Sequence, residues 1–206
     1  VKEDEPLEKE VAVDPEMLGK VFEKLLDSVD QKSKGAFYTP REVVHYMCQQ
    51  SLINYLSKNF NGKVKQEDIE EMVYRGELYK EINQAIQEGR LKSDNRNYKS
   101  QKLPEDIIKH AKEIDKLLEE IKICDPAIGS GAFPVGMMLE VVRVRDVLTN
   151  DLDNKELRTP YYFKRQAIEK SLYGVDIDAS AVDIAKLRLW LSLVVDEENV
   201  QEISPL

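Results

Sequence analysis

Cysteine clusters and long apolar runs are missing from this 206-residue sequence. The two cysteines, Cys48 and Cys124, have no CxxC partner or neighbouring histidine, which argues against a disulfide framework or a zinc site and fits a reducing cytoplasm. Both lie among apolar residues, so we expect small core side chains. No stretch has the apolar length of a membrane span, and the acidic N-terminus lacks the apolar core of a secretory signal, so we expect no membrane partner.

A basic charge balance is also missing, because 39 acidic residues outnumber 30 basic ones and the formal net charge is −9. A protein that grips DNA by itself usually carries a basic face. If double-stranded DNA is a partner, we therefore expect most phosphate contacts to come from regions outside this chain. The basic stretch 90–102 is flanked by acids and is a weak candidate for such contacts.

Several ligand motifs are absent as well. The glycine-rich segment 125–133 has no GK[ST] ending for a phosphate-binding loop, and Pro134 takes the third glycine position of a dinucleotide fingerprint. No PD…(D/E)xK nuclease pattern occurs, and we expect no metal site. These absences disfavour a nucleotide hydrolase and a nicotinamide-binding dehydrogenase.

Three regions differ in pattern. Residues 1–56 predict an N-terminal helical region: Asp14 and Pro15 begin one helix, and Thr39 as N-cap with Pro40 in the first turn begins another that ends near Leu56. Residues 57–120 are charge-rich and predict a helical insertion, with helical patterns over 69–79 and 107–121. Residues 121–206 predict a third region, described next.

The third region alternates strands and helices. Short strands are predicted over 121–125 and 172–176, and helices over 132–148, 160–170 and 178–195, the last capped by Asp178. This order predicts an α/β fold, namely the first half of a doubly wound, Rossmann-like sheet. Such a sheet normally has more strands, so we expect the chain to be a fragment.

Two carboxylates stand where the predicted strands end. Asp125 precedes the tight turn 126–131, whose glycines let a ligand approach the main chain, and a carboxylate there suits a ligand with a cationic end, such as S-adenosylmethionine. Asp176 ends the second strand, where it can accept hydrogen bonds from two ribose hydroxyls, and Ile177 can cover an adenine ring. An ordinary packing turn and a solvated strand end remain the plain alternatives.

The segments GAFYTPREVVHYM, DPAIGSGAFPVGMM and LYGVDIDASAVDIAKLRLWLSL occur in that order. They resemble three motifs of gamma-type N6-adenine DNA methyltransferases, and in particular the methylase portion of type IIG restriction–modification enzymes. The resemblance covers about residues 12–56 and 121–196. It implies a methyltransferase fold that binds S-adenosyl-L-methionine.

By this resemblance, particular residues contact the cofactor. The first motif supplies Tyr38 and Thr39. A core or surface aromatic is an equally good interpretation of Tyr38, and a plain N-cap is nearly as good an interpretation of Thr39. The remaining contacts fall in the other two motifs, namely Asp125, Ala127, Ile128 and Gly129 at the methionine end and Asp176 and Ile177 at the nucleoside end. The family commonly has cysteine where this chain has Ile128.

The catalytic motif of the family, [NDS]PP[YFW], does not occur in the chain. In the family it holds the amine of a flipped adenine. We therefore expect this chain alone to bind cofactor weakly and not to methylate. Two alternatives stay open: a methyltransferase fold acting on RNA, protein or a small molecule, and an interaction module that has lost its ligand.

Overall fold

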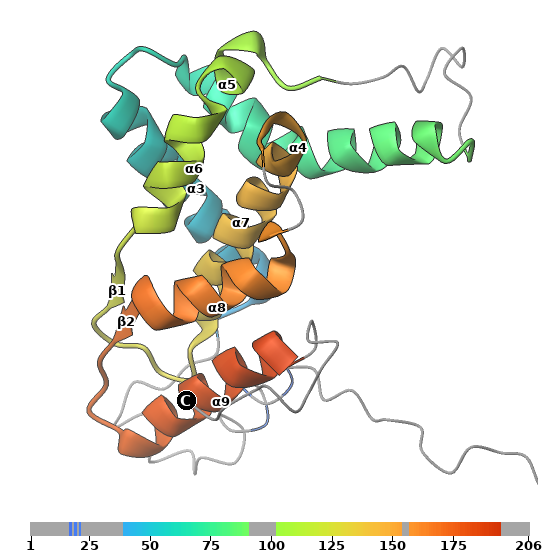
Figure 1. Cartoon of the computed structure of the whole chain (residues 1–206). Coiled ribbons are helices and arrows are strands. Elements are labelled where there is room, and N and C mark those ends of the chain that lie inside the picture. The colour runs from blue at the N-terminus through green and yellow to red at the C-terminus, as the bar shows by residue number, and fades with distance from the viewer. Residues whose placement is uncertain are drawn as a thin grey trace, which may run out of the picture.

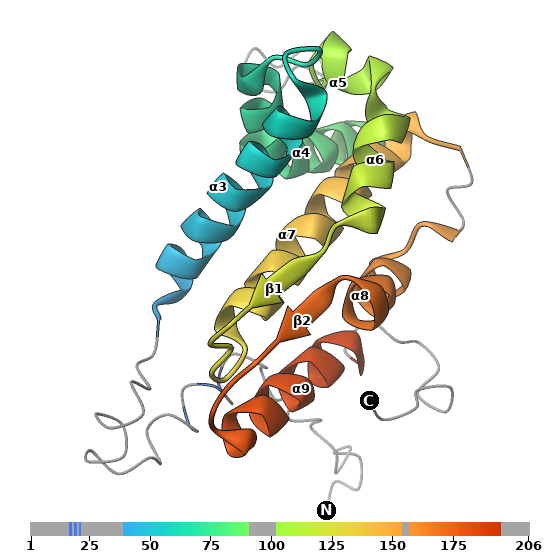
Figure 2. The same cartoon turned by 90° about the vertical axis from the view of Figure 1, so that its left-hand side faces the viewer.

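The computed structural model describes residues 39–90, 102–153 and 157–194, together with Met17, Gly19 and Val21. Within these ranges the protein is mostly helical and carries a small parallel sheet of two strands (Figures 1 and 2). The elements, in chain order, are α3 (Arg41–Phe60), α4 (Gln66–Gln87), α5 (Glu105–Lys109), α6 (Ala111–Glu120), β1 (Ile123–Asp125), α7 (Ala132–Leu148), η1 (Thr149–Asp151), α8 (Pro160–Lys170), β2 (Leu172–Gly174) and α9 (Ala179–Val194).

The sheet pairs β1 with β2 in parallel, with Ile123 opposite Leu172 and Asp125 opposite Gly174. Both strands are shorter than predicted: β1 begins two residues later and ends at Asp125 as predicted, whereas β2 ends at Gly174, where the chain leaves the ladder two residues early. The α/β order is confirmed, whereas the described residues contain only two strands of the expected doubly wound sheet. Figure 2 shows the two strands side by side, with α7 behind them.

Helix α7 lies at the centre of the molecule and packs against α3, α4, α6, α8, α9 and both strands. Its bounds are as predicted, because Gly131 takes a left-handed conformation (φ 83°) that the helix cannot continue through. The helix is apolar on most sides, as expected for one surrounded by other elements. Its buried residues link the two hydrophobic clusters of the protein.

Helix α8 also has the predicted bounds. Thr159 is its N-cap, since its side-chain oxygen accepts a hydrogen bond from the Tyr162 amide at 3.2 Å, and Pro160 follows in the first turn. At the start of α3 the corresponding prediction is wrong. Pro40 is the N-cap there and no side chain caps the helix, so the hydroxyl of Thr39 is not used as a cap.

The helices of the predicted insertion share one core with the helices around them. Buried residues of α3, α4, α5, α6 and α7 form a single cluster, which includes Leu52, Ile69, Ile107, Leu118 and Val144. The helical pattern predicted over 69–79 is part of the much longer α4, and α3 continues beyond Leu56 to Phe60. Apolar burial of this extent stabilises the insertion as part of the domain.

A buried charge cluster holds α6, α7 and the start of α8 together. Asp115 of α6 accepts a hydrogen bond from Arg145 Nε at 2.9 Å and two from Arg158, at 2.7 and 2.8 Å. Both guanidinium groups also lie over the ring of Phe163, at 4.4 and 5.0 Å from its centroid. Because one carboxylate pairs with two cations, its loss removes the close counter-charge of both and leaves Arg145 only the more distant Glu119, at 3.9 Å.

The two cysteines differ. Cys48 is fully buried in the core, as predicted, and burial together with the charge of Glu140 raises the pKa of its thiol to about 12. Cys124 is exposed, so the prediction of a core side chain is wrong for it. It lies on β1 beside the half-exposed Tyr173 of β2, on a sheet face that no described helix covers.

No helix within the described ranges has both the length and the apolarity to cross a lipid bilayer.

Candidate functional site

The glycine turn between β1 and α7 is fixed by backbone hydrogen bonds to the segment after β2. The Ile128 amide donates to the Val175 carbonyl at 2.9 Å, and the Val175 amide donates to the Asp125 carbonyl at 3.0 Å. The two chain segments that leave the sheet are therefore held next to each other. This brings the predicted residues of the second and third motifs to one edge of the sheet.

Both predicted carboxylates lie at this edge. One oxygen of Asp176, Oδ2, accepts a hydrogen bond from the Gly129 amide at 2.8 Å, and the other accepts one from the Asp178 amide at 2.9 Å. Asp125 Oδ1 accepts one from the Ala127 amide at 3.1 Å. Asp176 thus connects the turn after β1 with the turn before α9, and each of its oxygens keeps a second lone pair.

Close packing explains two of the glycines. A Cβ atom on Gly174 would lie 2.2 Å from Ile128 Cδ1, and one on Gly131 would lie 3.0 Å from Ala185 Cα, a backbone atom. Gly129 differs, because a Cβ there would meet nothing within 4 Å, although φ is also positive, at 51°. The turn is therefore packed against β2 and α9 but has open space beside Gly129.

The predicted site residues have different surroundings. Asp125, Ala127, Ile128, Gly129 and Asp176 are gathered at the sheet edge by the hydrogen bonds above. Ile177 follows directly and is 91% exposed, an unusual state for a large apolar side chain.

Of the two contacts predicted from the first motif, the described one, Thr39, is not part of this cluster. Thr39 is exposed and lines a cavity beside α7, and Tyr38 lies outside the described residues. Asp178, predicted to cap α9, accepts a hydrogen bond from the Ser180 amide at 3.0 Å, as a capping residue does.

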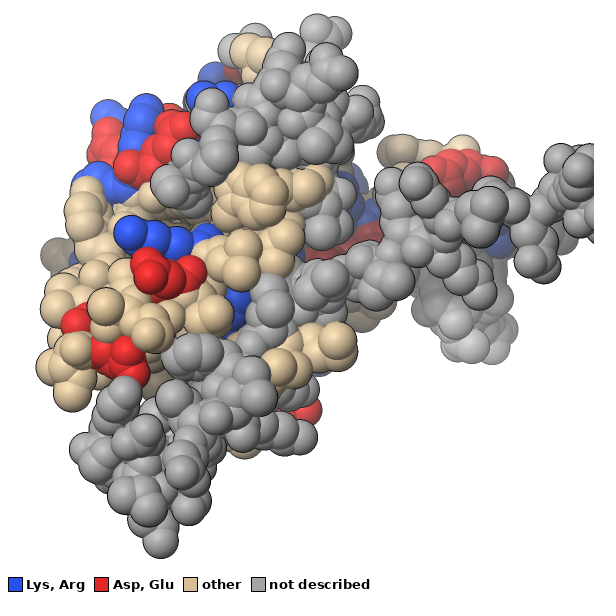
Figure 3. Space-filling model, turned by 90° about the horizontal axis from the view of Figure 1, so that it is seen from below, with Lys and Arg blue, Asp and Glu red and all other residues tan. Residues whose placement is uncertain are grey.

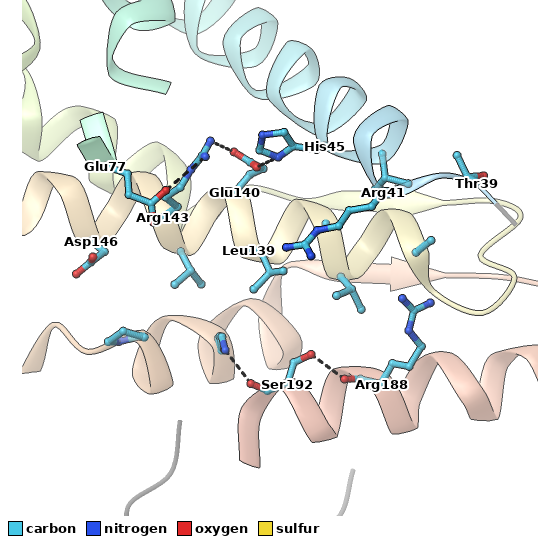
Figure 4. Close-up of a pocket in the computed structure, with 17 residues that line it drawn as sticks. Thr39, Arg41, His45, Glu77, Leu139, Glu140, Arg143, Asp146, Arg188 and Ser192 are labelled. Atoms are coloured by element: carbon cyan, nitrogen blue, oxygen red, sulfur yellow. Dashed lines mark hydrogen bonds and ion pairs between the residues drawn. The ribbon is translucent and has the colours of Figure 1, made fainter. Parts of the chain in front are cut away.

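A cavity of about 570 Å³ lies on the other side of α7 (Figure 4). Thr39, Ala132 and Arg188 line it, whereas neither Asp125 nor Asp176 does. The cavity is bounded by residues of α3, α4, α7, α8 and α9. It is therefore a neighbour of the glycine turn and not the space between the two carboxylates.

One wall of this cavity is charged. Glu140 of α7 is buried, and its carboxylate lies 2.6 Å from His45 Nδ1 of α3 and also pairs with Arg143. Arg143 in turn donates to the Val73 carbonyl at 3.0 Å and lies 3.7 Å from Glu77. Burial raises the pKa of Glu140, and the positive charge of Arg143 and the contact with His45 oppose that rise. The cluster binds α3 and α4 to α7.

The sequence patterns did not single out two buried polar residues next to the turn. Arg188 of α9 donates from Nη1 to the Ser130 carbonyl at 2.7 Å, and both side chains are buried. A signal was present, since Arg188 interrupts the apolar run Leu187–Val194. A charged residue inside an apolar helical run is buried only when it has a partner.

Charges of both signs are mixed on the face that includes α9. Figure 3 shows Lys, Arg, Asp and Glu side chains interspersed over the described part of this face, with no extended basic surface there. Within the described ranges, no three or more His, Cys, Asp or Glu side chains are grouped as a metal site requires.

The carboxylates of Asp125 and Asp176 at the sheet edge suit a ligand with hydroxyls and a positive charge, because carboxylates accept hydrogen bonds and attract cations.

Comparison with known proteins agrees with the motifs. The family model described as "MmeI, DNA-methyltransferase domain" matches residues 98–204. The chain is 31% identical over 189 residues to a Methanocaldococcus jannaschii protein described as a "putative type II restriction enzyme and methyltransferase". The match covers 90% of this chain and 14% of that relative, so the chain spans a small part of the relative's length. No solved structure matches it.

The family match includes the end of the predicted insertion, both strands, the glycine turn and α7 to α9. It therefore contains the whole sheet edge at which Asp125 and Asp176 lie. It covers 107 of the 206 residues, counted from 98 to 204. The chain therefore belongs to the MmeI DNA-methyltransferase domain family.

Proposed function

We propose that this chain is the S-adenosylmethionine-binding portion of a site-specific DNA adenine-N6 methyltransferase from a restriction–modification system of type IIG. The observation that carries the proposal is that Asp125 and Asp176 lie at the ends of two neighbouring parallel strands, where Asp176 accepts a hydrogen bond from the Gly129 amide of the turn that follows Asp125. Ligands of open α/β sheets bind outside the carboxyl ends of the strands. We propose that the two strands belong to a larger Rossmann-like sheet.

The methionine end of the cofactor fits the glycine turn. Asp125 uses Oδ1 within the turn, which leaves Oδ2 for the cationic amino group, and the open space beside Gly129 admits a ligand close to the main chain. Ala127 and Ile128 complete this end of the site. When bound, S-adenosylmethionine supplies a methyl group activated by its sulfonium.

The nucleoside end fits the segment after β2. The remaining lone pairs of Asp176 suit the two ribose hydroxyls, and the exposed side chain of Ile177 suits one face of the adenine ring. From the resemblance of their motif we also propose Tyr38 and Thr39, which precede α3 in the sequence, as further contacts. All these residues bind and orient the cofactor, which requires neither a metal nor a strong base.

The substrate assignment rests on the family and on the relative. A DNA-methyltransferase domain acts on DNA, and we infer adenine-N6 as the target from the three motifs. With no [NDS]PP[YFW] tetrapeptide and a net charge of −9, these 206 residues do not supply the groups that hold a flipped base or most phosphate contacts. We propose that other parts of the full-length protein supply both.

The division into 1–56, 57–120 and 121–206 remains our proposal for the domain organisation. Since helices from all three parts share one hydrophobic core, we propose that the insertion folds together with the other two parts as a single unit. The two unpaired cysteines agree with a protein of the cytoplasm, where the substrate DNA is found.

Calorimetric titration and product analysis test this function. The full-length protein is titrated with S-adenosylmethionine and, separately, with NAD, and is then incubated with DNA and methyl-labelled S-adenosylmethionine. We expect binding of S-adenosylmethionine only, and N6-methyladenine in the digested DNA. Label found in cytosine, RNA or protein would overturn the substrate assignment, and an absence of S-adenosylmethionine binding would overturn the proposal as a whole.

Alanine at Gly129 and at Gly131 is expected to separate cofactor binding from stability. Gly131→Ala should cost about 2–4 kcal/mol of unfolding free energy, because a left-handed residue gains a Cβ atom that meets the backbone of Ala185. Gly129→Ala carries only the conformational cost of about 1–2 kcal/mol, since its Cβ meets nothing in the protein. That Cβ fills the proposed ligand space, so the affinity for S-adenosylmethionine should fall about tenfold or more.

Urea unfolding and calorimetric titration of the two variants give both quantities. Wild-type affinity in Gly129→Ala would place the ligand away from the turn. Equal losses of stability in the two variants would contradict the difference in packing around the two glycines.

A further inference from the structure

Arg188 is buried directly behind the glycine turn. The residue is 3% exposed, and its Nη1 lies 2.7 Å from the carbonyl oxygen and 3.3 Å from the Oγ of Ser130, which is itself buried. Figure 4 shows its side chain rising from α9 toward α7. A charge-assisted hydrogen bond away from water is strong and directional, so this contact restricts where the Ser130 carbonyl can lie.

Gly19 lies close to the same guanidinium group. Gly19 is buried and helical, and a Cβ atom on it would lie 2.6 Å from Arg188 Nη1 and 3.2 Å from Ser130 Oγ. The absence of a side chain at Gly19 therefore allows the chain to close over the Arg188–Ser130 contact. On α9, Ser192 Oγ donates to the Arg188 carbonyl at 2.9 Å.

The turn is consequently held from both sides. Ser130 lies between Gly129 and Gly131, two glycines with positive φ, in a stretch with no regular secondary structure. On one side Asp176 accepts the Gly129 amide, and on the other Arg188 donates to the Ser130 carbonyl. Asp176 thus holds the Ile128–Gly129 peptide and Arg188 holds the Ser130–Gly131 peptide, so side chains from two different segments fix the peptides on either side of the Gly129–Ser130 peptide.

We propose that Arg188 is a positioning residue for S-adenosylmethionine. It does not touch the ligand; it fixes the Ser130 carbonyl, and through it the main chain that faces the methionine end. The inference rests on the proposed function, because it assigns a role relative to that ligand. A misplacement of the turn by about 1 Å is enough to weaken an oriented complex.

The test compares Arg188→Gln with Arg145→Gln in the full-length protein. The two arginines are equally buried, at 3% exposed, but Arg145 pairs with Asp115 at the far end of α7 and has no contact with the turn. Both variants are expected to lose stability. Only Arg188→Gln should raise the KM for S-adenosylmethionine, by about tenfold or more, with a much smaller change in kcat.

Two further variants make the result independent of folding. Arg188→Lys keeps the charge but not the forked donor, so it should restore part of the affinity lost in Arg188→Gln. Gly19→Ala, which displaces the guanidinium from outside α9, should raise the KM in the same direction. Hydrogen exchange of the Gly129 and Gly131 amides, followed by mass spectrometry below the unfolding temperature, should accelerate in Arg188→Gln and not in Arg145→Gln.

The outcomes are distinct. A wild-type protein that binds no S-adenosylmethionine overturns the proposed function together with this inference. If the wild type binds, and Arg188→Gln and Arg145→Gln change the KM by the same factor, the proposed function stands and the positioning role of Arg188 is overturned.

Discussion

Replacing Asp176 by alanine is expected to weaken S-adenosylmethionine binding about 100-fold or more. A carboxylate that accepts two ribose hydroxyls contributes about 1.5–3 kcal/mol for each charge-assisted bond, and about 1.4 kcal/mol corresponds to a factor of ten. The variant also frees the Gly129 and Asp178 amides, which both donate to this carboxylate. The loss therefore combines missing ligand bonds with a loosened turn. Calorimetric titration of the full-length protein measures it.

Two control variants separate these contributions. Asp176→Asn keeps one carbonyl acceptor but turns an NH₂ group toward a backbone amide, so its affinity should fall between those of wild type and Asp176→Ala. Asp178→Ala removes the capping bond to Ser180, which costs about 1 kcal/mol of stability and leaves cofactor affinity unchanged. Equal affinity in wild type and Asp176→Ala would remove Asp176 from the site.

Replacing Asp115 by alanine is expected to cost about 3–5 kcal/mol of unfolding free energy, the largest effect on stability that we predict. The side chains of Arg145 and Arg158 are 4% and 12% exposed, and Asp115 is the carboxylate that both contact within 3 Å. Without it two positive charges remain in a region from which water is excluded. Urea unfolding measures the change.

The control is a second aspartate with a similar bond in different surroundings. Asp153 lies 3.0 Å from Lys112, but both side chains are more than three-quarters exposed, so Asp153→Ala should leave stability nearly unchanged. If the two aspartate variants lost the same stability, burial would not be the reason for the importance of Asp115.

The same carboxylate gives a pH dependence with a defined sign. Burial opposes ionisation of Asp115, but the hydrogen bonds and charges of Arg158 and Arg145 outweigh it and hold its pKa below the ordinary value of 3.8. A carboxyl whose pKa is lowered by folding contributes stability above the unfolded pKa, and that stability is lost as the pH falls through the folded pKa. The difference in stability between wild type and Asp115→Asn should therefore be full at neutral pH and shrink in acid below about pH 4.

Local signals allowed parts of the fold to be predicted. Gly131 before α7 and the pair Thr159–Pro160 before α8 act on their own neighbours, so the first residues of both helices follow from the sequence alone. The start of α3 was misassigned because Thr39 and Pro40 form the same kind of pair, yet here the proline occupies the capping position. The same Thr–Pro pair therefore places the threonine at the N-cap of α8 but one residue before the N-cap of α3.

Contacts between distant segments could not be predicted. Asp115 contacts Arg145, 30 residues further along the chain, and Arg158, 43 residues further, and Arg188 contacts Ser130 across a separation of 58 residues. Hydrophobic periodicity describes neighbours within one helix or strand and says nothing about contacts at such separations. The exposure of Cys124 was missed for the same reason, since it depends on what covers the sheet. The juxtaposition of Asp125 and Asp176 was accessible because parallel strands align their carboxyl ends.

Helix α7 has a mechanical consequence. Its 17 residues form a rod about 25 Å long that begins at the glycine turn and ends among the helices of the insertion. A helix packed against helices and strands along its length can hardly bend, so a tilt at one end must appear as a displacement at the other. A displacement of the insertion helices is therefore expected to move the glycine turn, and a shift of the turn is expected to move those helices.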